Sequence, residues 1–219
     1  MKFGIAFEGL TDYITIENIL CGYFDDLDTD ELKDLQPQLD ETDKKQLDFG
    51  GWEKLLDYLK STYFRDALLN IEYIIIQIDS DISQHKNFGV SHYDENNQEL
   101  SQDVLIENIK THLIEIINTE ESDFYNYYAD KIVFAICVHS LECWLYAYYN
   151  KETLKNPKTK GCGNALNRCL NVKGFDDDKD KKLYQKYSKV FLKPKNIELV
   201  AQKSPSFNLF IQQLHNITL

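Results

Sequence analysis

Short apolar runs and longer amphipathic stretches alternate along this chain. Three runs, at residues 2–7, 71–78 and 131–138, are rich in β-branched or aromatic residues, which predicts strands buried on both faces. Residues 52–69 and 103–117 repeat leucine and isoleucine at the three- and four-residue spacing of amphipathic helices. The order of these elements predicts an α/β fold, with a mainly parallel sheet flanked by helices.

The stretches between these elements are interpreted from their polarity. Residues 25–48 are rich in Asp and Glu, so we expect an exposed insertion or irregular loop, with helix in part of it as an alternative. Residues 83–101 are expected to form a functional loop over the strand ends. Surface roles are expected for its histidines, His85 and His92, with substrate contact as the alternative. Residues 151–180 contain several glycines and are expected to be loop-rich, and the remainder of the chain is expected to be helical.

Charge is distributed unevenly. The formal net charge of −12 over 219 residues alone argues against binding to nucleic acid. Residues 1–150 hold 10 Lys or Arg and 30 Asp or Glu, whereas residues 151–203 hold 14 and 6. We therefore predict an acidic α/β core at 1–150 and a basic, mostly helical extension at 151–219, packed on that core. The basic region suits phosphate groups, and a solvated lysine-rich surface is the alternative.

Hydropathy and cysteine usage predict the cellular setting. No apolar stretch approaches the roughly 20 residues that span a bilayer, and the N-terminus lacks the pattern of a secretory signal, so we expect a cytoplasmic protein without a membrane partner. The cysteines are expected to be reduced and mostly buried, with a metal site at the last two as the less favoured alternative. They are Cys21, Cys137, Cys143, Cys162 and Cys169.

Acidic residues follow each predicted strand. Asp79 and Asp81 follow the central run, Glu8 follows the first, and Glu142 follows the third. Because the carboxyl ends of parallel strands meet at one edge of a sheet, we expect these acids to lie close together. Carboxylates are the ligands that Mg²⁺ prefers. Asp12 and Glu142 also stand at predicted helix starts, where a favourable interaction with the helix dipole is the alternative.

The motifs around these acids resemble those of the Toprim family. Residues 7–12 (Phe-Glu-Gly-Leu-Thr-Asp) and 78–81 (Ile-Asp-Ser-Asp) are similar to its strand-end Glu-Gly and later Asp-x-Asp. Residues 140–145 (Ser-Leu-Glu-Cys-Trp-Leu) resemble the Ser-x-Glu-x-Trp-Leu segment of stand-alone Toprim-like proteins from phage-defence loci, and 203–207 are similar to their C-terminal end. The resemblance covers residues 1–150 well and the rest loosely.

This resemblance implies a metal-dependent nuclease of the overcoming-lysogenization-defect type, active in anti-phage defence. It implies that Glu8, Asp79 and Asp81 are catalytic and bind Mg²⁺ or Mn²⁺, with Glu8 as general acid or base in the alternative. In that branch the first motif is Glu-Gly-x-Thr-Glu, and Asp12 stands at its second Glu. Asp12 and Glu142 are then ligands of a second metal ion.

The partners follow from the same interpretation. DNA or RNA is expected to bind the basic C-terminal third of the chain. A partner ATPase is expected because the sequence contains no G-x-x-x-x-G-K-[ST] loop. One of four lysines is expected to assist phosphate chemistry as a point charge: Lys186, Lys189, Lys193 or Lys195.

Two alternatives come from other functional classes. Residues 79–83 (Asp-Ser-Asp-Ile-Ser) are similar to the nucleophile loop of haloacid-dehalogenase phosphatases, in which Asp79 would attack the phosphate. That interpretation gives Glu8 and Glu142 no role. The second alternative is a non-catalytic binding or regulatory module with the same fold.

Overall fold

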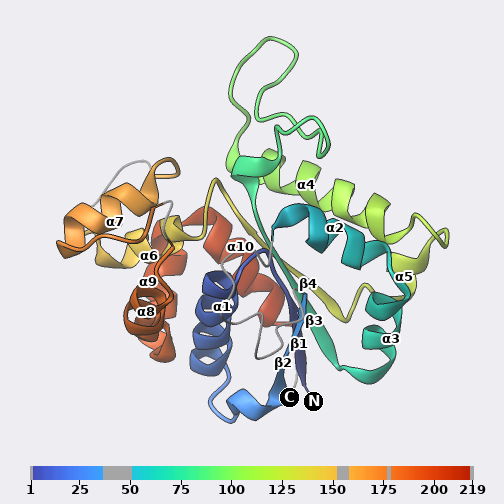
Figure 1. The fold of residues 1–219 in the computed structure, drawn as a ribbon, viewed down its shortest axis with the longest axis horizontal. Helices are drawn as coiled ribbons and strands as arrows, with labels where there is room; N and C mark the ends of the chain where they lie inside the picture. The colour runs from blue at the N-terminus through green and yellow to red at the C-terminus, as the bar shows by residue number, and fades with distance from the viewer. Residues whose placement is uncertain (1, 37–50, 152–157, 177–178, 218–219) are drawn as a thin grey trace.

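Helices lie on both sides of a central sheet in the computed structural model, which describes residues 2–36, 51–151, 158–176 and 179–217 (Figure 1). Within these residues the sheet has four strands, all parallel, in the order β2-β1-β3-β4. The strands are β1 (Phe3–Ala6), β2 (Leu32–Gln36), β3 (Tyr73–Asp79) and β4 (Ile132–Cys137). The predicted α/β class with a mainly parallel sheet is confirmed.

The central strands are apolar because helices cover both of their faces. In the middle of the sheet Ile75 pairs with Ile5 of β1 on one side and with Val133 of β4 on the other. Ile75 and Ile5 are fully buried, and Val133 is almost so. Strands buried on two faces need no alternation of polar and apolar residues. This explains the continuous apolar runs in the sequence.

The helices form one layer on each side of the sheet (Figure 1). One layer holds α1 (Leu10–Tyr23), α6 (Glu142–Tyr149), α8 (Lys181–Tyr187), α9 (Pro194–Lys203) and α10 (Pro205–Leu214). The other holds α2 (Trp52–Lys60), α3 (Thr62–Asn70), α4 (Gln102–Ile117) and α5 (Phe124–Tyr128). Helix α7 (Cys162–Leu170) packs on α6, and short 3₁₀ turns are η1 (Thr29–Glu31), η3 (Ser80–Ile82) and η4 (Ser188–Leu192).

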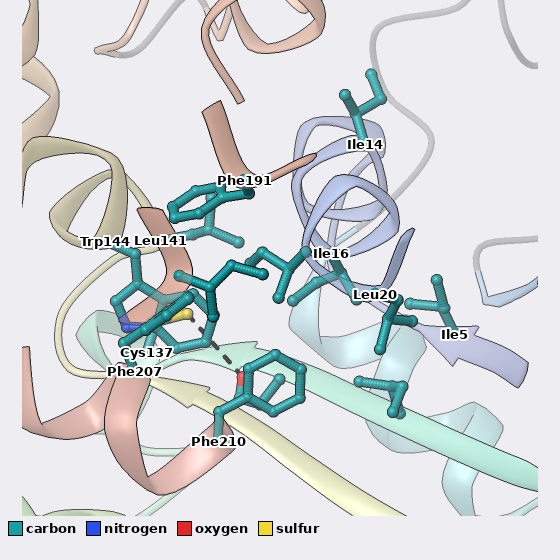
Figure 2. Close-up of a cluster of buried hydrophobic side chains, with 14 of the residues drawn as sticks. Ile5, Ile14, Ile16, Leu20, Cys137, Leu141, Trp144, Phe191, Phe207 and Phe210 are labelled. Atoms are coloured by element: carbon teal, nitrogen blue, oxygen red, sulfur yellow. Dashed lines mark hydrogen bonds between the residues drawn. The ribbon is translucent and has the colours of Figure 1, made fainter. Parts of the chain in front are cut away.

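An aromatic cluster joins the C-terminal helices to the sheet (Figure 2). The indole of Trp144 stacks on Phe210 with 5.7 Å between ring centroids, and meets Phe207 edge-on at 5.0 Å. The indole N–H of Trp144 donates to the Ser206 hydroxyl at 2.9 Å, so its polar atom is satisfied although the side chain is fully buried. Trp144 therefore serves packing, as a buried tryptophan usually does.

The C-terminal helices also approach α1 and β4 at the level of the backbone. A Cβ on Gly22 would lie 1.8 Å from the carbonyl oxygen of Phe191, so only glycine permits the observed contact of α1 with η4. Asn18 of α1 donates to the Ser188 hydroxyl at 2.7 Å.

In the part of the chain that the structure describes, no helix has the length and apolar character needed to cross a bilayer.

The structure differs in detail from three expectations about local structure. The loop expected at 25–48 contains η1 and the edge strand β2, where Leu32 and Leu35 are buried and Lys33 is exposed; residues 37–48 lie outside the described residues. An edge strand with two apolar residues gives a weak pattern. The helix expected at 52–69 is two helices, because Ser61 breaks it and caps the second. The loop-rich region 151–180 contains α7.

The cysteine expectation also fails in part. Cys143 and Cys162 form a disulfide that joins α6 to the first residue of α7. The other three are free: Cys137 is buried, Cys21 is partly buried and Cys169 is exposed. Local spacing does not reveal a pair whose members are 19 residues apart.

Candidate functional site

The ends of β1 and β3 are joined by the first strand-end acid. Glu8 Oε1 accepts a hydrogen bond from the main-chain N–H of Asp79 at 2.6 Å, and the Glu8 N–H donates to Gln77 Oε1 at 3.4 Å. Burial, followed by the negative charge of Asp12, raises the pKa of Glu8 to about 8. Glu8 and Asp79 therefore lie together at the carboxyl edge of the sheet.

Asp79 connects this edge to the start of α6. Its side chain is 5 % exposed, and its Oδ1 accepts hydrogen bonds from Gln77 Nε2 at 3.1 Å and from the Leu141 N–H at 3.0 Å. Leu141 immediately precedes Glu142, the first residue of α6. Burial and the charge of Asp12 raise the pKa of Asp79 well above its usual range.

Asp12 approaches the same edge from the first turn of α1. Its side chain is 1 % exposed, and its Oδ1 has no hydrogen-bond partner among the described residues. Gly9 leaves room for it, since a Cβ there would lie 3.2 Å from Asp12 Oδ2. Burial raises the pKa of Asp12 to about 6, although the positive charge of Lys179 acts in the opposite direction. A buried carboxylate oxygen without a donor is costly unless a cation or proton compensates for it.

Glu142 is held by two residues of the C-terminal region. The Tyr184 hydroxyl donates a short hydrogen bond to Glu142 Oε1, and Lys179 Nζ lies 3.9 Å from the same oxygen. Glu142 is 3 % exposed and Tyr184 is fully buried. Burial and the charge of Glu142 raise the pKa of Tyr184 well above its usual range, so its hydroxyl is a proton donor at neutral pH.

Asp81 completes the cluster from the outer side. It is exposed, its N–H donates to the His139 carbonyl at 3.0 Å, and its pKa is raised by partial desolvation. Ser80 orients this segment, since its hydroxyl accepts from the His139 N–H at 2.7 Å. The structure therefore places five acids near one edge of the sheet, where the strand-end acids were expected to meet: Glu8, Asp12, Asp79, Asp81 and Glu142.

Two histidines, His92 and His139, lie next to the Ser80–Asp81 segment. His92 was expected at the surface, yet it is 2 % exposed, and its Nε2 lies 2.7 Å from the Ser80 carbonyl oxygen, which satisfies this buried nitrogen. Its ring is 5.0 Å from that of His139, whose backbone adopts a left-handed φ of 61°. Burial and the neighbouring His92 lower the pKa of His139 to about 4, so it is neutral at pH 7. His85 is exposed, as expected.

Lys179 is the residue that the sequence interpretation missed. Its positive charge acts on all five acids of the cluster, and these acids, with Asp12 first, raise its pKa well above the usual range. The four lysines considered from the sequence are instead exposed on or beside α8 and α9: Lys186, Lys189, Lys193 and Lys195. The sequence feature that could have indicated Lys179 is its position directly after the acidic run 176–178.

The donor set suits a hard divalent cation. Five carboxylates supply oxygen atoms, and Asp12 Oδ1 has no competing hydrogen bond among the described residues. Across those same residues, however, no three His, Cys, Asp or Glu side chains are already arranged to hold a metal ion.

The fold and this cluster define an α/β protein with a carboxylate-rich site at the carboxyl edge of a parallel sheet. Comparisons with protein-family models, curated proteins and solved structures found no match to this chain.

Proposed function

We propose that this protein is a Toprim-like, metal-dependent nuclease that hydrolyses phosphodiester bonds in nucleic acid. The observation that carries the proposal is the meeting of acids from three separate strand ends at one edge of the sheet. Structural packing gives no reason to bury several carboxylates together, and Asp12 Oδ1 is buried without a donor in the described structure. A role in anti-phage defence fits the resemblance of the motifs.

Each acid has a role in this proposal. Glu8, Asp79 and Asp81 would hold a first Mg²⁺ or Mn²⁺ ion, and Asp12 and Glu142 would hold a second. Bound ions would supply positive charge to the phosphate oxygens and acidify a bound water. In the alternative role Glu8 acts as general acid or base instead of binding the ion, and its pKa of about 8 in the metal-free protein suits proton exchange near neutral pH.

The basic helices supply a surface for the nucleic-acid backbone. Exposed lysines lie along α8, η4 and α9, and α8 contains the Tyr184 that bonds Glu142. A strand bound along these helices would therefore approach the carboxylate edge. Lysine side chains bind phosphates as point charges, without reading the sequence. The partner ATPase remains a further element of the proposal.

The test is cleavage by the purified chain. Plasmid, single-stranded DNA and RNA are incubated with the protein in Mg²⁺ or Mn²⁺, and products are resolved on gels. Asp79→Asn, which keeps the shape and removes the charge, is expected to lower the cleavage rate by at least about 100-fold, as loss of a metal-binding charge does. The control Asp66→Asn removes an exposed carboxylate on α3 and is expected to cleave normally.

Other outcomes decide between the functional classes. Release of phosphate from a small phosphomonoester without polymer cleavage would favour the phosphatase alternative, with Asp79 as nucleophile. Metal-dependent binding of nucleic acid without either reaction would favour a non-catalytic module. Equal cleavage by the parent protein and Asp79→Asn would contradict the proposed site.

A further inference from the structure

Lys179 carries a positive charge that acts on every acid of the cluster. Its Nζ lies 3.9 Å from Glu142 Oε1, and its side chain remains 45 % exposed. Lys179 lies just before α8, and its backbone has a φ of 36°. The carboxylates on which it acts are those of Glu8, Asp12, Asp79, Asp81 and Glu142.

This ammonium group compensates for only part of the negative charge. It brings one positive charge to five carboxylates, and Asp12 Oδ1 still has no hydrogen-bond partner in the described structure although Asp12 is 1 % exposed. A divalent cation brings twice the charge and accepts carboxylate oxygens directly as ligands. The ammonium and such an ion would therefore compete for the same oxygens.

We propose that Lys179 is the internal counter-ion of this site, and that a divalent cation binds by displacing its ammonium group from the carboxylates. The inference rests on the proposed function, because it concerns the regulation of the same metal site.

The surroundings of Lys179 allow this exchange. Its half-exposed side chain can turn into solvent without opening the core. Tyr184 is fully buried and bonds the same Glu142 oxygen, so Glu142 keeps its position when the ammonium leaves. Ser188 bonds the Tyr184 carbonyl at 2.6 Å and accepts from Asn18 of α1, which ties Tyr184 to the core.

Competition between two cations has a measurable consequence. If metal binding requires the ammonium to leave, removing the ammonium must tighten metal binding. We expect Lys179→Met to lower the Kd for Mn²⁺ on the order of tenfold, in the absence of nucleic acid. Lys179→Arg keeps a competing cation and is expected to retain the parent Kd within about twofold.

The experiment is a Mn²⁺ titration at constant ionic strength, with free Mn²⁺ measured by electron paramagnetic resonance. The matched control is Lys182→Met, which changes the net charge equally at an exposed position of α8. Thermal unfolding checks that each variant is folded, and Lys179→Gln provides a second neutral variant. Tighter Mn²⁺ binding by Lys179→Met and Lys179→Gln, but not by Lys182→Met, would support the inference.

The contrary results separate this inference from the proposed function. If the parent protein binds Mn²⁺ and Lys179→Met binds it equally or more weakly, the inference is wrong while the metal site stands. Equal tightening in Lys182→Met would show a general charge effect and would also overturn it. If neither the parent nor Lys179→Met binds Mn²⁺, both the inference and the metal site are wrong.

Discussion

The carboxylate of Glu8 accepts a hydrogen bond from the main-chain N–H of Asp79 at 2.6 Å. A side chain that follows β1 is therefore bonded to the backbone at the end of β3, its neighbour in the sheet. This contact orients Glu8 toward the other acids. It also keeps the carboxyl group in a buried environment, where burial and Asp12 raise its pKa to about 8. The stability of the metal-free protein should therefore depend on pH.

Glu8→Gln is expected to weaken that pH dependence. Because the pKa of Glu8 rises from 4.5 to about 8 on folding, the folded protein holds a proton that the unfolded chain releases between these values. The contribution of the Glu8 carboxyl group to the free energy of unfolding is therefore present at low pH and is lost as pH rises from about 4.5 to 8. Glutamine stays neutral, so we expect Glu8→Gln to be more stable than the parent at pH 8, on the order of 2 kcal/mol.

Urea unfolding in the presence of EDTA, at pH values from 5 to 8, measures this effect. The two proteins should converge toward pH 5. Glu95→Gln, in the exposed loop before α4, removes the same charge and serves as the control. A parent protein whose stability stays constant between pH 5 and 8 would show that Glu8 titrates normally.

Tyr184→Phe is expected to impair the site without unfolding the protein. The ring contacts with Phe175 remain, but Glu142 loses the hydroxyl that positions it. Removing such a supporting hydrogen bond typically costs about 10- to 100-fold in metal affinity or activity. The cleavage rate and the Mn²⁺ Kd measure the effect. Tyr187→Phe removes a hydroxyl from the same helix, and it should change neither quantity; equal losses in both variants would point to a packing effect.

The sequence predicted β1, β3, β4 and the acidic edge of the sheet because these features depend on local patterns. The runs 71–78 and 131–138 are apolar throughout, which a buried parallel strand requires, and each precedes acidic or polar residues. The relation between strand ends and ligand sites then placed acids such as Glu8 and Asp79 at one edge. The structure agrees on this placement.

The residues that the sequence did not predict act over long distances in the chain. Lys179 and Tyr184 reach Glu142 from about 40 residues away, and no local spacing reports such a contact. His92 is buried and its ring nitrogen is paired with the Ser80 carbonyl oxygen, although the surrounding segment is polar. Tertiary contacts that satisfy polar groups can override the surface preference of a residue.

The disulfide between Cys143 and Cys162 should stabilise the attachment of α7 to α6. Closing a loop with a separation of 19 residues is worth about 3 kcal/mol in the chain-entropy account. The double variant Cys143→Ser with Cys162→Ser should lose about that much stability in thermal or urea unfolding. Cys169→Ser, which removes an exposed free thiol, should have little effect. Alkylation of both Cys143 and Cys162 in the folded protein without reductant would contradict the pairing.

Lys186→Gln combined with Lys189→Gln should weaken nucleic-acid binding through lost phosphate contacts. Each contact contributes about 0.7 to 0.9 to the slope of log affinity against log salt, so the slope should fall by about 1.5. Fluorescence anisotropy with a labelled single strand, at several salt concentrations and in EDTA, measures it. The pair Lys33→Gln with Lys60→Gln removes equal charge far from α8. A similar loss in this control would indicate only the effect of net charge.

Gln213→Ala should destabilise the sheet at its β4 edge. The side-chain amide of Gln213 accepts from the Phe134 N–H and donates to the Phe134 carbonyl, both at 2.9 Å, as a neighbouring strand would. The edge beside it faces a cavity of about 390 Å³ that Phe134 and Ile136 help to line. Alanine leaves the Phe134 peptide group without these partners, and water entering the cavity compensates only in part.

We expect Gln213→Ala to lower the free energy of unfolding by about 1 to 2 kcal/mol, as the loss of partners for a part-buried peptide group does. Hydrogen exchange at the Phe134 amide should also become faster. Gln212→Ala truncates a glutamine at the neighbouring, exposed position of α10, and it should be close to neutral in both measurements. Unchanged exchange at Phe134 in Gln213→Ala would show that the Gln213 side chain does not protect this amide, and would contradict the prediction.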